Sequence, residues 1–171
     1  MPEVVVDAER CLGCKSCEIA CTVEHSHSKS LVSAVCEPDA PRKHIFVCAA
    51  AGQSIPLHCR HCEEAPCVRA CPTGALYRDG GLVLFAKERC LGCGMCQMAC
   101  PFGVITRLPH SKIIAKCDRC PDRSTPACVD ACPTGALQFR DLAILVDTRR
   151  QKLAEKILLG FHVFSERKED E

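Results

Sequence analysis

Aromatic side chains are scarce in this sequence of 171 residues, which has no tryptophan and one tyrosine. Proteins that bind single-stranded nucleic acid use aromatic rings on which bases stack, together with an excess of positive charge. Here 22 basic residues stand against 21 acidic ones, so the net charge is +1. Both features argue against a nucleic-acid surface. The shortage of rings also predicts a poor hydrophobic core for this length.

Long apolar runs are missing too. The longest candidate, Ile157 to Phe164, contains Gly160 and His162, whereas a helix that crosses a bilayer needs about 20 apolar residues. The first residues, MPEVVVDAERC, lack the basic region, apolar segment and cleavage site of an export signal. We therefore expect no direct membrane span and a cytoplasmic location.

Cysteine is abundant, with eighteen residues. Such a fraction indicates either a disulfide scaffold in a secreted chain or metal sites in a reducing compartment, and the missing export signal favours metal. Sixteen of the cysteines form four runs that each end in Cys-x-x-x-Cys. The runs are Cys11, Cys14, Cys17 and Cys21; Cys59, Cys62, Cys67 and Cys71; Cys90, Cys93, Cys96 and Cys100; and Cys117, Cys120, Cys128 and Cys132.

The spacing within the first and third runs is that of bacterial ferredoxins, in which three thiolates hold one [4Fe–4S] cluster and the fourth ligates its neighbour. We expect this fourth cysteine at the start of a short helix. Zinc is the main alternative, but zinc sites pair two Cys-x-x-Cys knuckles across a longer gap, and four repeats of a triplet plus one suit them badly. The pattern predicts four [4Fe–4S] clusters, which replace part of the missing core.

The connecting segments indicate which runs share ligands. Between the second and third runs, ALYR and LVLF flank Asp-Gly-Gly, which predicts a β-hairpin. PTGALQFRD after the fourth run is the first half of such a hairpin, and EVVVDAERC at the start of the chain matches its second half, LVLFAKERC. Strand Val4–Asp7 should therefore pair with Ala136–Phe139. This nests the first and fourth runs around the other two; sequential pairing is the alternative and leaves two half-hairpins unpaired.

The predicted fold is α+β, with two pseudo-symmetric two-cluster ferredoxin-like modules and a C-terminal helix. Residues 1–141 form the four-cluster domain, with an inner module at about 57–101 and an outer module at about 3–35 plus 102–141. VITRLPHSKIIAKC and HIFVCAAAGQSIPLHC are expected to form two further hairpins. The ligand sets are Cys11, Cys14, Cys17 and Cys132 for cluster 1; Cys59, Cys62, Cys67 and Cys100 for cluster 2; Cys90, Cys93, Cys96 and Cys71 for cluster 3; and Cys117, Cys120, Cys128 and Cys21 for cluster 4.

Residues 142–171 are predicted to hold a helix and a charged tail. The helix is expected at Asp147–Phe164, with one apolar face that either packs on the ferredoxin body or docks a partner or a second copy. The tail SERKEDE reads as disordered. The residues of the apolar face are Leu153, Ile157, Leu158 and Phe161.

Some residues near the runs invite other functions. Cys36 and Cys48 lie outside every run, and we expect ordinary small residues there rather than a disulfide or extra cluster ligands. Sixteen cysteines already supply four ligands to each cluster, so nearby histidines and cations are candidates only for tuning a cluster potential. No nucleophile–base pair, phosphate loop or nicotinamide fingerprint is present, which predicts a non-catalytic protein. The tuning candidates are His25, His27, His58, His61, Lys15 and Arg60.

The second run has x2-x4-x3 spacing and the fourth run a wide middle gap. With these motifs, roughly residues 3–141 resemble the four-cluster iron–sulfur subunits found beside molybdopterin oxidoreductases, formate dehydrogenases, hydrogenases and carbon monoxide dehydrogenases. CEIACTVEHSHSKSL and PLHCRHCEEAPCVRACPTGAL are most similar to the subunit associated with carbon monoxide dehydrogenase. The resemblance implies an electron relay between such a dehydrogenase and an acceptor, such as a hydrogenase or an NAD(P)-linked flavoprotein. A formate dehydrogenase or hydrogenase complex is the alternative.

Overall fold

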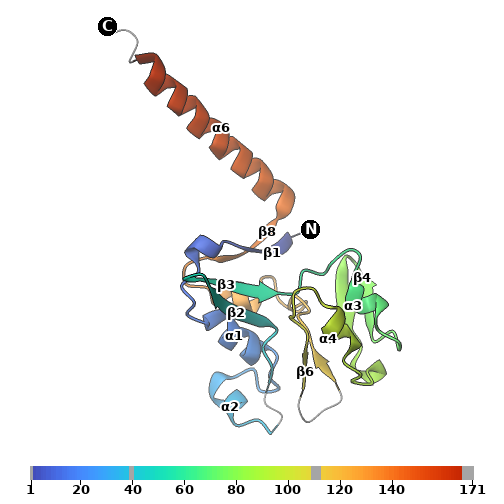
Figure 1. Ribbon diagram of the computed structural model, residues 1–171. Helices are drawn as coiled ribbons and strands as arrows, with labels where there is room; N and C mark the ends of the chain where they lie inside the picture. Colours follow the sequence, from blue (N-terminus) through green and yellow to red (C-terminus); the bar gives the residue numbers. More distant parts are fainter. Residues whose placement is uncertain (1, 39–40, 109–112, 167–171) are drawn as a thin grey trace. The chain divides into compact units, whose positions relative to one another are not determined.

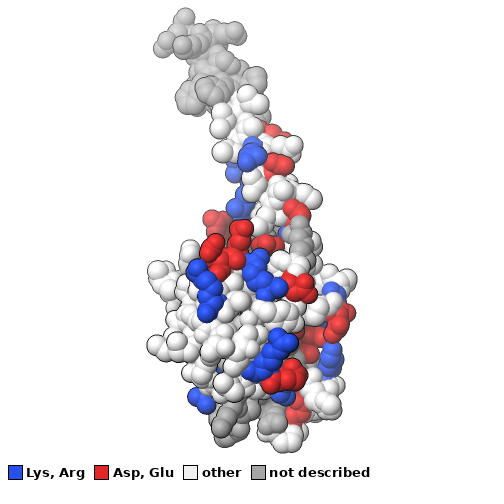
Figure 2. Space-filling view, turned by 90° about the vertical axis from the view of Figure 1, so that its right-hand side faces the viewer, with Lys and Arg blue, Asp and Glu red and all other residues white. Residues whose placement is uncertain are grey.

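The computed structural model describes residues 2–38, 41–108 and 113–166 as a small mixed α and β protein (Figure 1). These residues form two compact units. One comprises residues 6–137 and contains all four cysteine runs, and the other comprises residues 2–5 with 138–166. The strands of the described residues form four two-stranded sheets. On the face drawn in Figure 2, acidic and basic side chains are interspersed rather than gathered by sign.

The hairpin between the second and third runs is present as predicted. Strands β4 (Leu76–Asp79) and β5 (Leu82–Phe85) are antiparallel, with Leu76 opposite Phe85. The two turn residues, Gly80 and Gly81, have φ values of +52° and +84°. A type I′ turn needs positive φ at both central positions, which is why glycine occupies them.

Two more predicted hairpins are confirmed. Strands β2 (Ile45–Ala50) and β3 (Gln53–His58) pair antiparallel over their whole length. The short strands β6 (Thr106–Arg107) and β7 (Ile114–Ala115) pair in the same sense. Each hairpin leads directly into a cysteine run, so these sheets fix where the second and fourth runs begin.

The first strand pairs with the last one, as the sequence predicts. Strand β1 (Pro2–Val6) and strand β8 (Leu137–Asp141) form a two-stranded sheet. Next to it, the Asp7 backbone N–H donates to the Ala136 carbonyl at 2.8 Å. The inner hairpin has the same bond at its equivalent position, where the N–H of Ala86 donates to the carbonyl of Ala75 at 2.8 Å. A strand from the N-terminus therefore supplies the missing half of the C-terminal hairpin.

A short helix accompanies every run, but it lies one cysteine earlier than expected. Each of these helices contains the third cysteine. The fourth cysteine lies inside the helix in the first run and just beyond the helix in the other three. The four-residue spacing is about one helical turn, or about 6 Å along the axis, so the two thiols share a side but stand at different heights. The helices are α1 (Ser16–Glu24), α3 (Pro66–Arg69), α4 (Met95–Ala99) and α5 (Ala127–Asp130), and the remaining short ones are η1 (Ala8–Arg10), α2 (Leu31–Val35) and η2 (Lys87–Arg89).

The main apolar cluster is small and includes cysteine side chains. It joins β4, β5 and the β6–β7 hairpin to the helices of the second and third runs. Thiols occupy positions where a larger core would place rings or branched side chains, in line with the scarcity of aromatics. Its buried members are Ala65, Cys67, Leu76, Val83, Cys96, Ile105 and Ile114.

The C-terminal helix α6 (Leu142–Glu166) starts earlier than the predicted Asp147. The Asp141 carboxylate accepts a hydrogen bond from the Ala143 N–H at 3.0 Å, and this N-cap begins the helix directly after β8. The helix also includes the first two residues of the predicted disordered tail; the others, 167–171, and the Phe161 side chain lie outside the described residues. No described helix is long and apolar enough to cross a membrane. The remaining residues of the predicted apolar face, Leu153, Ile157 and Leu158, are exposed.

Candidate metal centres

Every run turns through a residue in the left-handed region. This residue lies directly before the second cysteine, and its φ is +68° at Gly13, +49° at His61, +64° at Gly92 and +70° at Arg119. Residues with a Cβ rarely adopt such values, so the repetition shows that all four runs need the same turn. The first and third runs have glycine at this position, whereas the second and fourth runs have a residue with a side chain in the same conformation.

The turn brings backbone N–H groups to cysteine sulfur. The N–H of His61 donates to Cys59 Sγ, and the N–H of Gly92 donates to Cys90 Sγ, each at 3.4 Å. Hydrogen bonds to the sulfur ligands are one of the means by which a protein sets the potential of an iron–sulfur cluster.

Two small cavities collect cysteines from different runs. One is lined by three cysteines of the third run and the last of the second, and the other by three of the first run and the last of the fourth. In both, the added cysteine comes from the run named in the nested prediction. The lining cysteines are Cys90, Cys93, Cys96 and Cys71 in one cavity, and Cys11, Cys14, Cys17 and Cys132 in the other.

The thiols predicted to hold cluster 2 also lie near one another. Burial raises the pKa of Cys67, and the neighbouring thiols of Cys59 and Cys100 raise it further. Cys62 is half-buried in the same turn, and its carbonyl accepts a hydrogen bond from the Arg78 guanidinium.

The cysteines predicted for cluster 4 behave in the same way. Burial raises the pKa of Cys128, with further contributions from Cys117, Cys21 and Cys120 in that order. Each of the four predicted sets therefore has members from two runs that lie close enough to influence one another's ionisation.

The chemistry of these thiols fits iron–sulfur clusters. All eighteen cysteines are free rather than paired in disulfides. Burial is the largest cause that raises the pKa of Cys17 and Cys96 to about 11 and that of Cys117 to about 12. Thiols grouped in this way repel one another as thiolates, so their ionisation calls for bound cations. Iron in four [4Fe–4S] clusters meets that requirement with four thiolates per cluster.

The last cysteines of the second and fourth runs are shifted in the opposite direction. Burial opposes ionisation, but hydrogen bonds outweigh it and lower the pKa of both Cys71 and Cys132. The leading donors are the backbone N–H of Leu76 for Cys71 and that of Leu137 for Cys132, the latter at 3.5 Å. These donors come from the matching Cys-Pro-Thr-Gly-Ala-Leu segments, so the two sites are built alike.

Comparison with known proteins supports the binding of 4Fe-4S clusters by this chain. Residues 50–142 match the 4Fe-4S dicluster domain, and residues 8–24 match a 4Fe-4S binding domain. The chain belongs to the 4Fe-4S dicluster family. It is 35% identical to an "Iron-sulfur protein" of Rhodospirillum rubrum, with 90% of each chain covered.

Two further relatives of this dicluster protein are named for electron transport. The electron transport protein HydN of Escherichia coli is 38% identical, with 78% of this chain and 85% of HydN covered. The thiosulfate reductase electron transfer subunit PhsB of Salmonella typhi is 40% identical, with 78% and 72% covered. This protein is likewise a non-catalytic iron–sulfur protein of electron transfer, which confirms its resemblance to iron–sulfur subunits of oxidoreductases. Its likeness to the subunit of carbon monoxide dehydrogenase stays a prediction.

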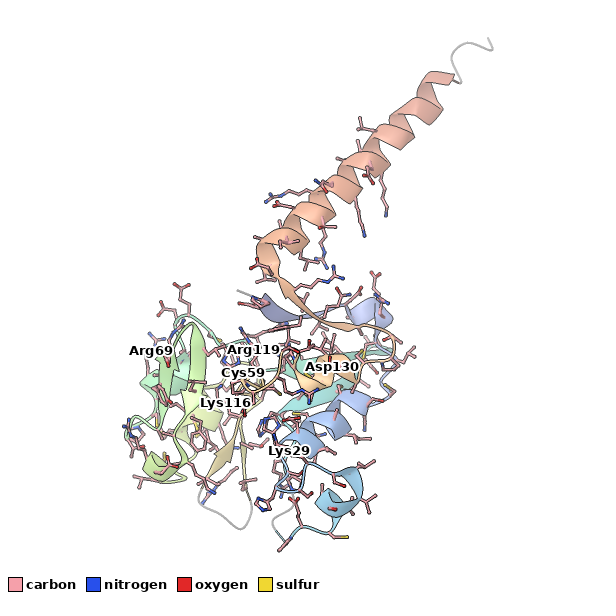
Figure 3. The ribbon with its side chains drawn as sticks, turned by 180° about the vertical axis from the view of Figure 1, so that it is seen from behind. Lys29, Cys59, Arg69, Lys116, Arg119 and Asp130 are labelled. Atoms are coloured by element: carbon pink, nitrogen blue, oxygen red, sulfur yellow. The ribbon has the colours of Figure 1, made fainter. Side chains whose placement is uncertain are left out.

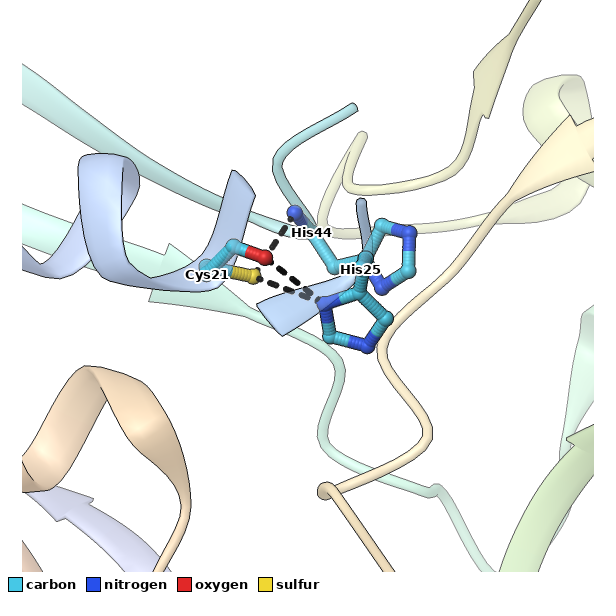
Figure 4. Close-up of side chains that lie close together, drawn as sticks. All are labelled: Cys21, His25 and His44. Atoms are coloured by element: carbon cyan, nitrogen blue, oxygen red, sulfur yellow. Dashed lines mark hydrogen bonds between the residues drawn. The ribbon is translucent and has the colours of Figure 1, made fainter. Parts of the chain in front are cut away.

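Two histidines lie beside Cys21, a predicted ligand of cluster 4 (Figure 4). The His44 backbone N–H donates to Cys21 Sγ at 3.2 Å, and His25 Nδ1 lies 2.8 Å from the Cys21 carbonyl and 3.7 Å from its sulfur. On its other side, His25 Nε2 lies 3.1 Å from an Asp118 carboxylate oxygen. The two imidazole rings are 3.9 Å apart between centroids.

The two histidines of this group are in different states. Burial opposes protonation of His25, but Asp118 and Cys21 outweigh it and raise its pKa to about 11. Burial and the neighbouring His25 lower the pKa of His44 to about 4. His25 was a candidate from its position near the first run. His44 and Asp118 were missed, because nothing in the sequence shows that these distant residues meet.

The other tuning candidates are divided by burial. His27 and Arg60 are exposed, whereas His58 and His61 are buried. His58 Nδ1 lies 2.9 Å from the Cys59 carbonyl, and His61 Nδ1 accepts a hydrogen bond from the Val83 N–H at 3.0 Å.

Lys15, Cys36 and Cys48 are the remaining residues singled out from the sequence. Lys15 lines the cavity of the first run at the N-cap of α1. Cys36, at the end of α2, and Cys48, in β2, are exposed and free. Neither cysteine lines the two cavities that collect run cysteines.

Proposed function

We propose that this protein relays single electrons through four [4Fe–4S] clusters between a catalytic redox enzyme and a second redox partner. The observation that carries the proposal is the meeting of cysteines from different runs in the nested combination, three from one run and the last from another. When bound, the clusters supply one-electron carriers. The chain's part is to hold them at fixed spacing, bury them and donate hydrogen bonds to their sulfur ligands.

The electrostatic influence of one ligand set on another supports a linear order. Cys17, in the set of cluster 1, influences the ionisation of Cys128, in the set of cluster 4. Cys59, in the set of cluster 2, does the same for Cys117 of cluster 4. Clusters 2 and 3 share the inner module, so the order is 1–4–2–3. Short steps favour electron transfer because tunnelling weakens steeply with distance, and this order makes clusters 1 and 3 the two ends.

The catalytic partner we propose is carbon monoxide dehydrogenase, on the strength of the sequence resemblance. A formate dehydrogenase or a hydrogenase complex is the alternative. The Salmonella relative is named as a subunit that serves thiosulfate reductase, which supports a catalytic partner of some kind. The second partner is an acceptor such as a hydrogenase or an NAD(P)-linked flavoprotein. Free thiols in such number suit a reducing, cytoplasmic compartment. Co-purification of the native complex identifies the catalytic subunit.

The cluster count is tested by assaying iron and acid-labile sulfide on anaerobically purified protein. Four clusters require about sixteen atoms of each per chain. About four zinc atoms without sulfide would show instead that the chain is a structural zinc protein.

The ligand exchange is tested with Cys132→Ser. Nested pairing predicts damage to the cluster on Cys11, Cys14 and Cys17, seen as the loss of one cluster signal in electron paramagnetic resonance. Sequential pairing predicts damage at the third run instead. Cys36→Ser, at an exposed cysteine outside the runs, is the matched control and should retain all four clusters.

A further inference from the structure

A buried lysine lies where the inner hairpin meets the fourth run. Lys116 is 5% exposed, and its ammonium donates to the Val83 carbonyl of β5 and, at 2.7 Å, to the Cys117 carbonyl. Figure 3 labels Lys116 in the same region as Cys59 and Arg119. The ammonium thus contacts the backbone of a predicted cluster 4 ligand and, through Val83, the strand of the inner module.

The surroundings of Lys116 leave its charge uncompensated. Both of its hydrogen-bond acceptors are neutral carbonyls, and no carboxylate forms an ion pair with it among the residues that the structure describes. Next to it, the Val83 N–H donates to His61 at 3.0 Å. Because His61 Nδ1 accepts this bond, the imidazole ring is neutral and adds no charge beside Lys116.

The ammonium lies next to two ligand sets. On one side it contacts the carbonyl of Cys117, in the set of cluster 4. On the other side it contacts Val83, which belongs to the same buried cluster as Cys67 of the cluster 2 set. The Val83 N–H also donates to His61, whose own N–H donates to Cys59 Sγ of that set. Clusters 2 and 4 are adjacent in the order inferred above.

We propose that Lys116 is a positioning residue whose ammonium raises the reduction potentials of clusters 2 and 4, the two middle stations of the relay. The inference rests on the proposed ligand sets. Reduction adds one negative charge to a cluster, and a buried cation close to it stabilises the reduced form with little screening by salt. Charge and hydrogen bonding near the cluster are established means by which a protein sets its potential. One side chain thereby raises the reduction potentials of both middle clusters, which favours electron transfer to them from cluster 1 or from cluster 3.

The test is a potentiometric titration of the holoprotein, followed by electron paramagnetic resonance, for Lys116→Gln and Lys116→Arg. Glutamine keeps a donor for the two carbonyls but removes the charge. We expect a roughly tenfold lower ratio of reduced to oxidised cluster at a given applied potential, equivalent to about 59 mV for one electron, in two of the four steps. Lys116→Arg should titrate like the wild type. Lys87→Met removes an equal charge from an exposed position and should move no step.

The remaining outcomes separate this inference from the relay itself. A chain without about sixteen iron and sulfide refutes the four-cluster proposal. A wild-type chain with four clusters, whose Lys116→Gln variant moves no step or moves all four equally, refutes only the role of Lys116. If Lys116→Gln and Lys116→Met both lose the middle clusters while Lys116→Arg keeps them, the ammonium serves assembly, and the proposed effect on potential is overturned.

Discussion

Replacing Glu18 by glutamine removes a buried negative charge from helix α1 and leaves the shape of the side chain almost unchanged. Glu18 is 7% exposed and lies between Cys17 and Cys21. One carboxylate oxygen accepts from the Lys43 ammonium and the other from the Val47 N–H, each at 2.6 Å. This carboxylate therefore attaches strand β2 and the segment before it to the helix of the first run.

The expected cost follows from these two contacts. Removing one partner of a fully buried ion pair costs about 3–5 kcal/mol, but the Lys43 side chain is 39% exposed, so solvent reduces this contribution. The bond from Val47 also changes from a charge-assisted to a neutral one, a loss of about 1 kcal/mol. We expect Glu18→Gln to destabilise the holoprotein by about 2 kcal/mol. Glu18→Ala should cost about 4 kcal/mol, because it removes both contacts and leaves the partly buried Val47 N–H without an acceptor.

The assay is the rate at which the visible cluster absorbance is lost in guanidinium under anaerobic conditions, since unfolding with cluster loss is irreversible. If the whole effect falls on unfolding, 2 kcal/mol accelerates the loss about 30-fold. Glu64→Gln is the matched control, because Glu64 pairs with Arg69 at 82% exposure and should change the rate less than threefold. Equal rates for Glu18→Gln and Glu64→Gln would refute the reasoning.

Two further changes are measurable with the same assay. Gly13→Ala should cost about 2 kcal/mol, since φ is +68° and the new Cβ would lie 2.6 Å from the Ser54 hydroxyl. Gly74→Ala is the control and should cost about 1 kcal/mol, because φ is +63° there but nothing lies within 4 Å of the new Cβ. Adding Ser54→Ala to Gly13→Ala should recover part of the difference, and equal costs at both glycines would contradict the contact with Ser54. The raised pKa of His25 makes its stabilisation by Asp118 complete below pH 6.5 and lost as the pH rises towards 11. Asp118→Asn should flatten the dependence of the rate between about pH 6 and 9, and an unchanged slope would argue against the pair.

The sequence was most informative where one residue type meets one geometric demand. Asp-Gly-Gly predicted the β4–β5 hairpin because its turn needs positive φ twice. The matching halves at the two chain ends predicted the β1–β8 pairing, since a half-hairpin needs a partner strand. Cysteine spacing predicted metal sites, because each of the four runs holds four cysteines and ends in Cys-x-x-x-Cys.

Other features depend on distant contacts or local capping. The pairing of His25 with Asp118 joins residues 93 positions apart, and no local pattern signals it. The left-handed turns at His61 and Arg119 follow from the convergence of thiols rather than from residue preference. Helix α6 began earlier than expected because Asp141 caps it, a role that apolar periodicity does not reveal. The helices of the runs were placed one cysteine late, because spacing alone does not say which thiol starts the turn.

The pairing of β1 with β8 also dictates an order of assembly on the ribosome. Strand β4 meets its partner β5 after a few residues of synthesis, so the inner hairpin closes while the chain is still growing. Strand β1 precedes every other described strand, yet it has no partner until Asp141 has been made, and domains form as their segments emerge from the ribosome. Of the described strands, the one that is made first is therefore the last to be paired. A message truncated before β8 would yield a protein in which the strand directly before the first cysteine run has no partner.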